Sequence, residues 1–308
     1  MLMFVLNWNI DKVFCSMDEI ILYANNNVVM RREDLIHPFI SGNKYRKLKY
    51  NLQKAKALNK NTLLTFGGAY SNHIAATAYA GKSYGFKTTG IIRGEELKDK
   101  VESNPTLKFA KSCGMQFKFV TREAYRNKLE NDFIENLKLE FGDFYLVPEG
   151  GTNQLAVKGC EEILNIDDEC FDFICCCVGT GGTISGLINT SKPHQKILGF
   201  PALKGDFIRE DIRKFAKKEN WDLITDYHFG GYGKIKPELI TFINDFKRKY
   251  NVLLDPVYTG KMMYGIFDLI EKQFFPEEAK ILAIHTGGLQ GIDGMNIKLK
   301  QKGWPQIE

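Results

Sequence analysis

The chain has 308 residues, of which 44% are hydrophobic and 26% are charged, and its formal net charge is +5. This length suffices for one large α/β domain or two moderate ones, and the composition is that of an ordinary globular protein. Lysine and arginine are spread along the chain without a dense basic run, which argues against nucleic-acid binding, and no apolar stretch is as long as a membrane span.

Short strand-like runs alternate with helix-like runs along the whole chain. The predicted strands are residues 62–66, 88–93, 116–120, 144–147, 171–178, 197–200, 251–254 and 281–285. The predicted helices are residues 43–58, 72–84, 105–112, 123–141, 152–164, 183–191, 236–250 and 261–272. Such alternation, with nearly continuous apolar strands, is typical of parallel sheets covered by helices on both faces. We therefore expect an α/β protein with two open, twisted, mostly parallel sheets.

The grouping of the strands predicts a smaller domain inserted into a larger one. The first four strands fall within residues 49–151, which we assign to the small domain, and residues 1–48 and 152–308 form the large domain. Ligands of open α/β sheets bind beyond the carboxyl ends of the strands. The glycine turns at residues 67–68, 150–151, 179–182 and 287–288 therefore predict where the site lies.

Two features of the sequence bear on the compartment. The apolar residues 1–8 have no basic leader and no small-residue cleavage site, so we expect no signal peptide. The seven cysteines lack framework spacing, which predicts reduced thiols and a cytoplasmic location. Three of them, Cys175, Cys176 and Cys177, are consecutive in an apolar run, and we expect them to point alternately to the two faces of a buried strand.

The first candidate for chemistry is Lys44, which follows a Ser-Gly-Asn turn at residues 41–43. A lysine amine reacts with an aldehyde when burial or a nearby cation keeps it partly neutral, and Arg46 and Lys47 are close in sequence. Local composition does not separate Lys44 from Lys47 as the reactive residue. We nevertheless expect Lys47 and Lys49 to lie on a solvated helix face.

A second segment opens a helix rich in alanine. Ser71 and Asn72 are favoured as N-caps, and a capping turn also presents side chains to a ligand. Three roles stay open for His73, namely stacking on a ligand, hydrogen bonding to it, and packing within the helix.

The third segment is a glycine-rich turn between an apolar strand and a helix start. It has neither the ending of a Walker motif nor the spacing of the dinucleotide pattern. Backbone N–H groups in such a turn, together with the helix dipole, favour an anion. The residues expected to form this anion cradle are Gly179, Thr180, Gly181, Gly182 and Thr183.

An amine, a group of hydroxyl and amide side chains, and an anion cradle match the needs of one cofactor. Pyridoxal phosphate requires an amine for its aldehyde, a hydrogen-bond partner for its ring hydroxyl and exposed N–H groups for its phosphate. The sequence therefore predicts pyridoxal 5'-phosphate as cofactor. No histidine or cysteine pair has zinc-ligand spacing together with a matching second pair, so we expect no metal. We also expect no hydrolase of the nucleophile-elbow type.

Two tyrosines stand out because they lie in loop-like segments that contain glycine or proline. Tyr232 is part of Gly-Tyr-Gly, and Tyr258 is part of the segment DPVYTGK. A tyrosine beside the cofactor acts as a general acid or base if its neighbours lower its pKa. Thr286, in the segment HTGG after an apolar strand, is expected at the same rim.

In combination these motifs closely resemble the family of D-cysteine desulfhydrases and 1-aminocyclopropane-1-carboxylate (ACC) deaminases. The resemblance runs from about residue 31 to residue 288 and rests on SGNKYRKLKY, TFGGAYSNHIAATA, VPEGGTN, VGTGGT, GYG, DPVYTGKMMYG and HTGG. Members are pyridoxal-phosphate enzymes of the tryptophan synthase β-subunit fold type, known as fold type II. The resemblance also implies a homodimer.

The resemblance assigns roles to individual residues. It implies that Lys44 is the Schiff-base lysine, that Asn72 meets the ring hydroxyl, and that Ser71 meets the substrate carboxylate or assists proton transfer. It implies that the anion cradle holds the phosphate and that Thr259 and Thr286 lie near the pyridine nitrogen and the substrate pocket. Tyr232 and Tyr258 match the two active-site tyrosines of the family. The expected substrate contacts are Ser71, Asn72, His73 and Tyr258.

Two threonines separate the two activities of the family. Deaminases carry a glutamate where Thr259 stands and tend to carry leucine where Thr286 stands, and both positions here resemble the desulfhydrases. A carboxylate keeps the pyridine nitrogen protonated, which a neutral threonine cannot do by charge. We therefore expect α,β-elimination of D-cysteine, with Lys44 as the preferred base, giving pyruvate, ammonia and sulfide.

Several alternatives remain open at this point. They are ACC deamination to 2-oxobutyrate and ammonia, a racemase or dehydratase on the same fold, and a non-catalytic small-molecule-binding α/β protein. The substrate can also be another D-amino acid with a β-leaving group, such as chloroalanine or a D-serine derivative, since Met262 and Met263 reshape one wall.

Overall fold

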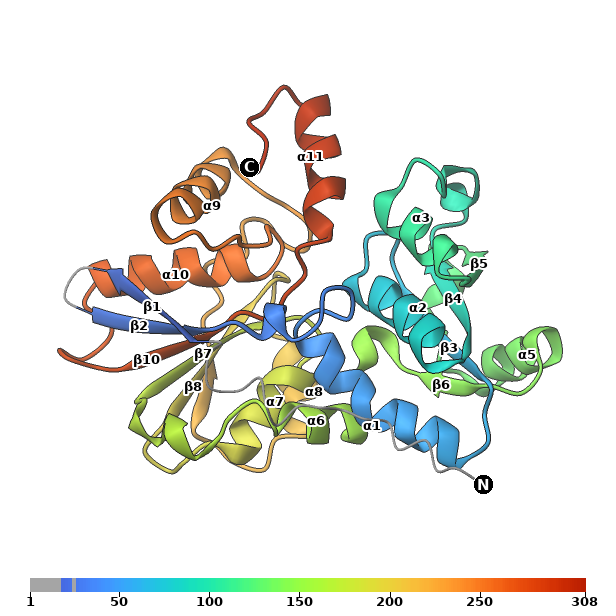
Figure 1. Cartoon of the computed structure of the whole chain (residues 1–308), viewed down its shortest axis with the longest axis horizontal. Helices are drawn as coiled ribbons and strands as arrows, with labels where there is room; N and C mark the ends of the chain where they lie inside the picture. Colours follow the sequence, from blue (N-terminus) through green and yellow to red (C-terminus); the bar gives the residue numbers. More distant parts are fainter. Residues whose placement is uncertain (1–17, 24–25) are drawn as a thin grey trace.

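The computed structural model describes residues 18–23 and 26–308, and its strands form two separate sheets (Figure 1). Helix α1 (Asn43–Ala57) lies between them, in contact with α6 (Gln154–Cys160) beside the larger sheet and α2 (Asn72–Tyr84) beside the smaller one. In the described part of the chain no helix is long and apolar enough to cross a membrane. Residues 1–8, in which we expect no signal peptide, and Cys15 lie outside the described residues.

The larger sheet has six strands, and all its neighbouring pairs are parallel except the first two strands, which form an antiparallel edge. Their order is β1 (Asp18–Tyr23), β2 (Asn26–Arg31), β10 (Ile281–Ile284), β7 (Phe173–Val178), β8 (Lys196–Pro201) and β9 (Trp221–Leu223). Cys175 and Cys177 of β7 pack on one face with α9 (Pro237–Tyr250) and α10 (Thr259–Glu271). Cys176 packs on the opposite face with α6, α7 (Gly182–Thr190) and α8 (Ile208–Arg213), so the predicted alternation of the cysteines is confirmed.

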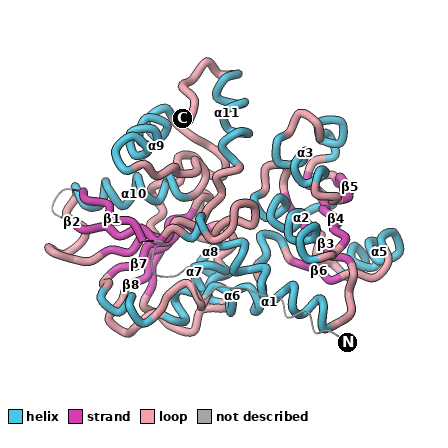
Figure 2. The backbone as a smooth tube through the Cα atoms, viewed as in Figure 1, coloured by secondary structure: helices cyan, strands magenta, loops and turns pink. Residues whose placement is uncertain are grey.

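The smaller sheet has four parallel strands, which Figure 2 shows as a second group of magenta segments. Their order is β5 (Gln116–Val120), β4 (Lys87–Arg93), β3 (Thr62–Gly67) and β6 (Tyr145–Val147). Helices α2 and α3 (Pro105–Ser112) cover one face, and α4 (Arg122–Arg126) and α5 (Asn131–Phe141) cover the other. The predicted fold class is therefore confirmed. The predicted division into domains stays a prediction, and its junction at residue 48 falls inside α1.

Two predicted elements are wrong. Residues 251–254 do not pair with a strand; Val252 and Leu254 are buried in the core of the larger sheet without a hydrogen-bonded ladder. The predicted helix 123–141 is two helices, because the chain turns between Asn127 and Glu130. The sequence interpretation also missed several elements. These are β1, β2, β9, α8, α11 (Gly291–Gln301) and the short 3₁₀ helices Glu33–Leu35, Glu95–Lys100, Glu149–Gly151 and Ile166–Cys170.

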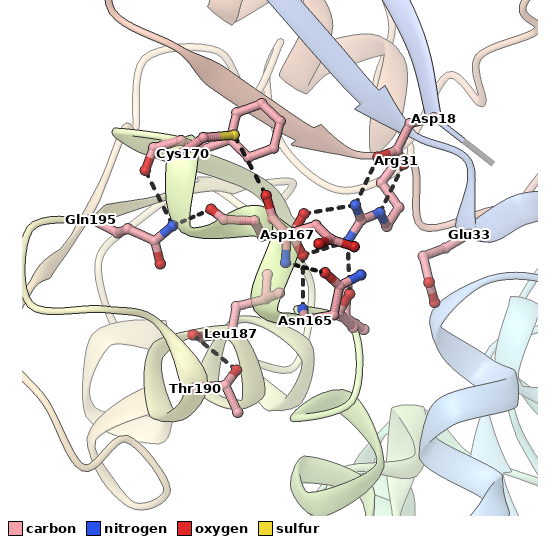
Figure 3. A network of polar contacts seen from close by, with 12 residues as sticks. Asp18, Arg31, Glu33, Asn165, Asp167, Cys170, Leu187, Thr190 and Gln195 are labelled. Atoms are coloured by element: carbon pink, nitrogen blue, oxygen red, sulfur yellow. Dashed lines mark hydrogen bonds and ion pairs between the residues drawn. The ribbon is translucent and has the colours of Figure 1, made fainter. Parts of the chain in front are cut away.

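A buried arginine fixes the end of β2 against the segment that precedes β7. Figure 3 shows Arg31 between Asp18 and the loop that carries Asn165. Its guanidinium donates to Asp18 at 2.8 and 2.7 Å, to both carboxylate oxygens of Asp168 at 2.7 Å and to the carbonyl of Ile163 at 3.0 Å. Because two carboxylates and a carbonyl satisfy this buried cation, the arrangement is rigid and costly to break.

Bare backbone contacts bring α1, α6 and α7 close together. A Cβ added at Gly159 of α6 would lie 2.0 Å from the carbonyl oxygen of Arg46 in α1. A Cβ added at Gly186 of α7 would lie 2.6 Å from the backbone carbon of Cys160 in α6. No side chain fits at either contact, so the two glycines set the spacing of the three helices.

Candidate active site

A cavity of ≈ 1180 Å³ is lined by residues from both sheets. Its wall includes the loops that follow β3, β7 and β10, where the glycine turns predict a site. The predicted site residues that line it are Lys44, Ser71, Asn72, His73, Gly179, Thr180, Gly181, Thr183, Tyr232, Tyr258 and Thr286. Gly182 and Thr259 do not line it, although each is next in sequence to a residue that does.

The turn before Lys44 is held by a contact that only glycine permits. Gly42 has φ 60°, and a Cβ added there would lie 2.0 Å from the carbonyl oxygen of Thr286. The next N–H group, that of Asn43, donates to the same carbonyl at 3.2 Å. The start of α1 is thus fixed on the loop after β10, which turns Lys44 toward the cavity.

We expect Gly42→Ala to lower the free energy of unfolding by about 3 kcal/mol, because it adds both backbone strain and a clash with Thr286. The matched control is Gly114→Ala. Gly114 also has positive φ, 89°, but an added Cβ there meets nothing within 4 Å. The control should lose only about 1 kcal/mol in urea unfolding. Equal losses for the two variants would contradict this account of the turn.

The amine of Lys44 is shifted toward its neutral form. Burial, followed by the charge of Lys47, lowers the pKa of Lys44 from 10.5 to about 7. Arg46, the other cation close in sequence, instead donates to the carboxylate of Glu33 at 2.9 and 2.8 Å. At neutral pH a substantial fraction of the Lys44 amine is therefore nucleophilic.

The prediction that Lys47 and Lys49 lie on a solvated face is wrong. Lys47 is 2% exposed, and its Nζ donates to Thr152 Oγ1 at 3.1 Å and to Thr180 Oγ1 at 3.4 Å. Lys49 is mostly buried and forms an ion pair of 2.6 Å with Glu162. Lys47 has no carboxylate partner within the part of the chain that the structure describes. Burial lowers the pKa of Lys47, because a charged amine is costly in the protein interior.

The glycine-rich turn lies directly against this lysine. Gly181 has φ 79° and precedes α7, whose first N–H groups have no acceptor within the helix. A Cβ added at Gly182 would lie 2.9 Å from the side chain of Thr152 and 3.2 Å from Nζ of Lys47. The side chain of Asn43 donates to Thr183 Oγ1 at 2.9 Å, which ties the turn to α1. Free N–H groups at a helix start beside a buried lysine are an arrangement that favours an anion.

The segment after β3 places three side chains at the cavity in different ways. Ser71 caps α2, accepting from the N–H of Ile74 at 3.4 Å. The side-chain nitrogen of Asn72 lies near Gly288, where an added Cβ would be only 2.5 Å away. Ser71 and Asn72 thus belong to the start of α2 and also line the cavity, the two roles that the sequence analysis considered.

His73 is 1% exposed and packs within the helix while also lining the cavity. Its Nε2 is 2.8 Å from Thr65 Oγ1, and Thr65 donates its own proton to the carbonyl of Val147 at 2.8 Å. Nε2 therefore carries the imidazole proton. Nδ1 is left as an acceptor with no partner among the described residues, and burial keeps the pKa of His73 well below its usual value.

The two tyrosines meet at the cavity, with ring centroids 6.1 Å apart. Their side chains are hydrogen-bonded to each other. Burial raises the pKa of Tyr232, and burial and the neighbouring Tyr232 raise that of Tyr258 further. The sequence argument required a lowered pKa for either to act as a base. Both hydroxyls instead keep their protons, which suits proton donation.

The two threonines are each held by a neighbour that the sequence interpretation did not include. Thr259 is fully buried, and its hydroxyl donates to Asp255 Oδ1 at 2.9 Å. Asp255 lines the cavity, but its carboxylate also accepts from the N–H groups of residues 257, 258 and 259. The hydroxyl of Thr286 lies 2.9 Å from Sγ of Cys177, and both of these residues line the cavity.

Comparison with known proteins identifies the family. A family profile described as pyridoxal-phosphate dependent enzyme matches residues 22–287. The chain belongs to the pyridoxal-phosphate dependent enzyme family. Its cofactor is therefore pyridoxal phosphate, as the sequence predicts.

Relatives within this family agree with the resemblance seen in the motifs. The chain is similar to the mitochondrial bifunctional D-cysteine desulfhydrase/1-aminocyclopropane-1-carboxylate deaminase of Arabidopsis thaliana, with 32% identity over 85% of this chain and 72% of the relative. It is also similar to the 1-aminocyclopropane-1-carboxylate deaminase of Rhizobium rhizogenes, with 29% identity over 82% and 84% of the two chains. A crystal structure of an ACC deaminase homologue matches with a TM-score of 0.78 and 30% identity, covering 89% of this chain and 88% of that chain.

The residues of the cavity fit the cofactor of the family. Gly182 leaves room at the anion cradle that a Cβ would fill, and Lys47 adds a buried amine that has no carboxylate partner among residues 18–23 and 26–308. One face of α1 supplies both Lys44 and Lys47, since residues three apart lie on the same side of a helix. That spacing was the signal in the sequence that could have identified Lys47.

Proposed function

We propose that this chain is a lyase that catalyses α,β-elimination of D-cysteine, or of a related β-substituted D-amino acid, to pyruvate, ammonia and sulfide. The observation that carries the proposal is the cavity amine of Lys44, whose pKa of about 7 suits both covalent attachment and proton removal at neutral pH. The bound cofactor supplies the electron withdrawal that makes the α-proton of the substrate acidic.

We assign the remaining binding and proton-transfer roles to individual residues. We assign the phosphate to the anion cradle and Lys47, the ring hydroxyl to Asn72 and the substrate carboxylate to Ser71 with its helix N-terminus. Lys44 Nζ takes the α-proton. We assign proton donation to the departing sulfur to the Tyr258 hydroxyl, which its raised pKa keeps protonated.

The environment of Thr259 favours elimination over opening of a cyclopropane ring. Its hydroxyl is neutral and is bound to Asp255, whose two oxygens already accept four hydrogen bonds. A carboxylate saturated in this way is a poor partner for a further cation, so this wall offers little charge to a pyridine nitrogen. Loss of a thiolate needs less electron withdrawal than ring opening, because sulfide leaves readily.

The proposal is tested with purified protein loaded with cofactor. D-Cysteine should give pyruvate and sulfide, and the rate should exceed that of 2-oxobutyrate and ammonia formation from ACC. ACC deamination is the second candidate, since the Rhizobium rhizogenes relative bears that name. Activity on ACC alone would contradict the argument from the two threonines. A protein that binds the cofactor but acts on no D- or L-amino acid would instead be a binding protein.

The pH dependence of covalent cofactor attachment should reveal the low pKa of Lys44. Only the neutral amine attacks the aldehyde, so the rate of covalent attachment should rise with pH up to about 7 and become level above it. An ordinary lysine would show a rate that keeps rising toward pH 10. Stopped-flow absorbance from pH 5.5 to 9.5, on this protein freed of cofactor, distinguishes the two profiles.

We also propose that the enzyme is a cytoplasmic homodimer, as the resemblance implies. Support for the compartment comes from the cysteines in the described part of the chain, all of which are free thiols. Sedimentation equilibrium should give the mass of two chains of 35.2 kDa. A mass of one chain at micromolar concentration would contradict the dimer.

A further inference from the structure

The rim of the cavity carries four cations that the proposed chemistry does not use. They are Arg93, Lys234, Lys298 and Lys302, and all of them line the cavity and are exposed. Across residues 18–23 and 26–308, none of the four has a carboxylate within ion-pair distance. Arg122, a further cation of this wall, differs because it forms an ion pair of 2.8 Å with Glu96.

These cations come from both sides of the opening. Arg93 ends β4, and its guanidinium is the group nearest to the open side of Gly68, at 4.0 Å from an added Cβ. Lys298 lies in α11 with its Nζ 4.4 Å from the centre of the Tyr70 ring. Lys234 follows the Gly-Tyr-Gly loop, and Lys302 comes one helical turn after Lys298. The rim therefore presents positive charge toward any ligand that extends out of the cavity.

The carboxylates of the wall do not neutralise this charge. Glu149 accepts from the hydroxyl of Tyr125 at 2.8 Å and pairs with Lys128 at 3.2 Å. Asp211 pairs with Lys214 at 2.6 Å, and Asp255 is saturated by its own loop.

The lysines of the rim also repel one another. Partial burial, followed by the charges of Lys234 and Lys302, lowers the pKa of Lys298. An anion between them would relieve this repulsion.

We infer that the cation rim, Arg93 with Lys234, Lys298 and Lys302, recognises a second anionic group on the substrate, namely a carboxylate carried by its β-substituent. This rests on the proposed elimination, and it narrows the substrate class from D-cysteine to D-cysteine thioethers with an acidic leaving group. The cradle with Lys47 and the turn at Ser71 already account for the phosphate and the α-carboxylate. The cavity volume of ≈ 1180 Å³ leaves room, since pockets for drug-sized ligands span about 300–1,000 Å³.

The reaction on such a thioether needs no additional reactant except water. The Cα–H and Cβ–S bonds break, the thiol leaves with a proton, and a carbon–carbon double bond forms. Water then hydrolyses the enamine to pyruvate and ammonia. No electron is gained or lost overall, and pyruvate is a common readout for every substrate in the series.

Two substrates of almost identical shape test the inference. S-Carboxymethyl-D-cysteine and S-carbamoylmethyl-D-cysteine differ only in the charge of the group at the far end of the leaving thiol. We expect kcat/KM to be at least about tenfold higher for the acid at low salt, mainly through a lower KM. The preference should shrink as ionic strength rises, because the rim is exposed and its field is screened.

Variants locate the preference on the rim. Arg93→Gln and Lys298→Gln should each reduce the ratio of kcat/KM for acid over amide by about fivefold, and the double variant should abolish the preference. Arg122→Gln is the matched control for Arg93, because Arg122 already has a carboxylate partner. Lys300→Gln is the control for Lys298, since Lys300 lies in the same helix but does not line the cavity. Neither control should change the ratio.

The possible failures are distinct. Equal kcat/KM values for acid and amide in the unaltered enzyme would overturn the inference and leave the proposed elimination standing. A rim variant that raises KM for D-cysteine as much as for the acid would also overturn it, because the rim would then hold the α-carboxylate. Absence of pyruvate from D-cysteine and from both thioethers would overturn the proposed function itself.

Discussion

Replacing Lys44 by alanine should abolish covalent attachment of the cofactor and lower kcat/KM for elimination by about 10³-fold or more. The amine is both the attachment point and the proposed base, and a positioned acid–base group alone contributes about 10²–10⁴-fold. Reduction with borohydride followed by mass spectrometry measures attachment directly. The unaltered protein should gain the mass of one reduced cofactor on the peptide that contains residue 44, and the variant should gain none.

Lys54→Ala is the control for this experiment. Lys54 lies in the same helix but is exposed and points away from the cavity, so the variant should keep both attachment and activity. The Lys44 variant should still bind the cofactor without a covalent link, since the anion cradle and Lys47 are unchanged. Covalent attachment to Lys47 in the variant would contradict the assignment of Lys44 as the sole reactive lysine, a choice that local composition did not decide.

Replacing Lys47 by methionine should weaken binding of pyridoxal phosphate by about 10- to 100-fold, as expected for the loss of a charged hydrogen bond of about 1.5–3 kcal/mol. Pyridoxal, which has the same ring and aldehyde but no phosphate, should bind within about twofold of its affinity for the unaltered protein. The ratio of the two dissociation constants, from fluorescence titration, isolates the contribution of the phosphate.

The same variant should make the protein more stable when it holds no cofactor. Lys47 is 2% exposed. Its Nζ donates to the carbonyl of Gly150 and to the hydroxyls of Thr152 and Thr180, all of which are uncharged. A buried cation without an anion costs free energy, and methionine fills the space without that cost. The thermal midpoint of the apoprotein should therefore rise, whereas the increase produced by the cofactor should fall. A lower midpoint for the apoprotein would show that Lys47 has a structural partner instead.

Much of the fold follows from local sequence patterns. Seven of the eight predicted strands and the order of the helices depend on apolar runs and punctuating glycines, and these have clear physical causes. The predicted strand at residues 251–254 was wrong because burial, not strand pairing, explains its apolar residues. Val252 and Leu254 contact the core from a segment without strand pairing. The split of the helix at Asn127 carries no proline or glycine signal.

The site was predictable to the extent that its chemistry lies in contiguous motifs. The glycine-rich turn and the Ser71 turn can be recognised from a few neighbouring residues that favour a particular backbone conformation. Lys44 can be recognised as a reactive amine that follows a short turn. The environments of Lys47 and Cys177 are created by contacts across more than 100 residues, with Thr152 and Thr286 respectively, so for Lys47 the spacing from Lys44 was the signal in the sequence. The sequence did not reveal the role of Asp255 for a different reason. Its carboxylate accepts hydrogen bonds from the N–H groups of Val257 and Thr259, and an aspartate shortly before a helix is an ordinary feature of helix starts.

The contacts at Gly159 and Gly186 have a consequence for how this enzyme tolerates change. α1 carries Lys44, α7 begins at the glycine-rich turn, and α6 packs against both helices through Gly159 on the α1 side and Gly186 of α7 on the other. A methyl group added at either glycine would push the packed helices apart. The distance between the Lys44 amine and the glycine-rich turn would then increase, although neither of these had been altered. Loss of catalysis in this protein can therefore originate at two positions that never meet the substrate.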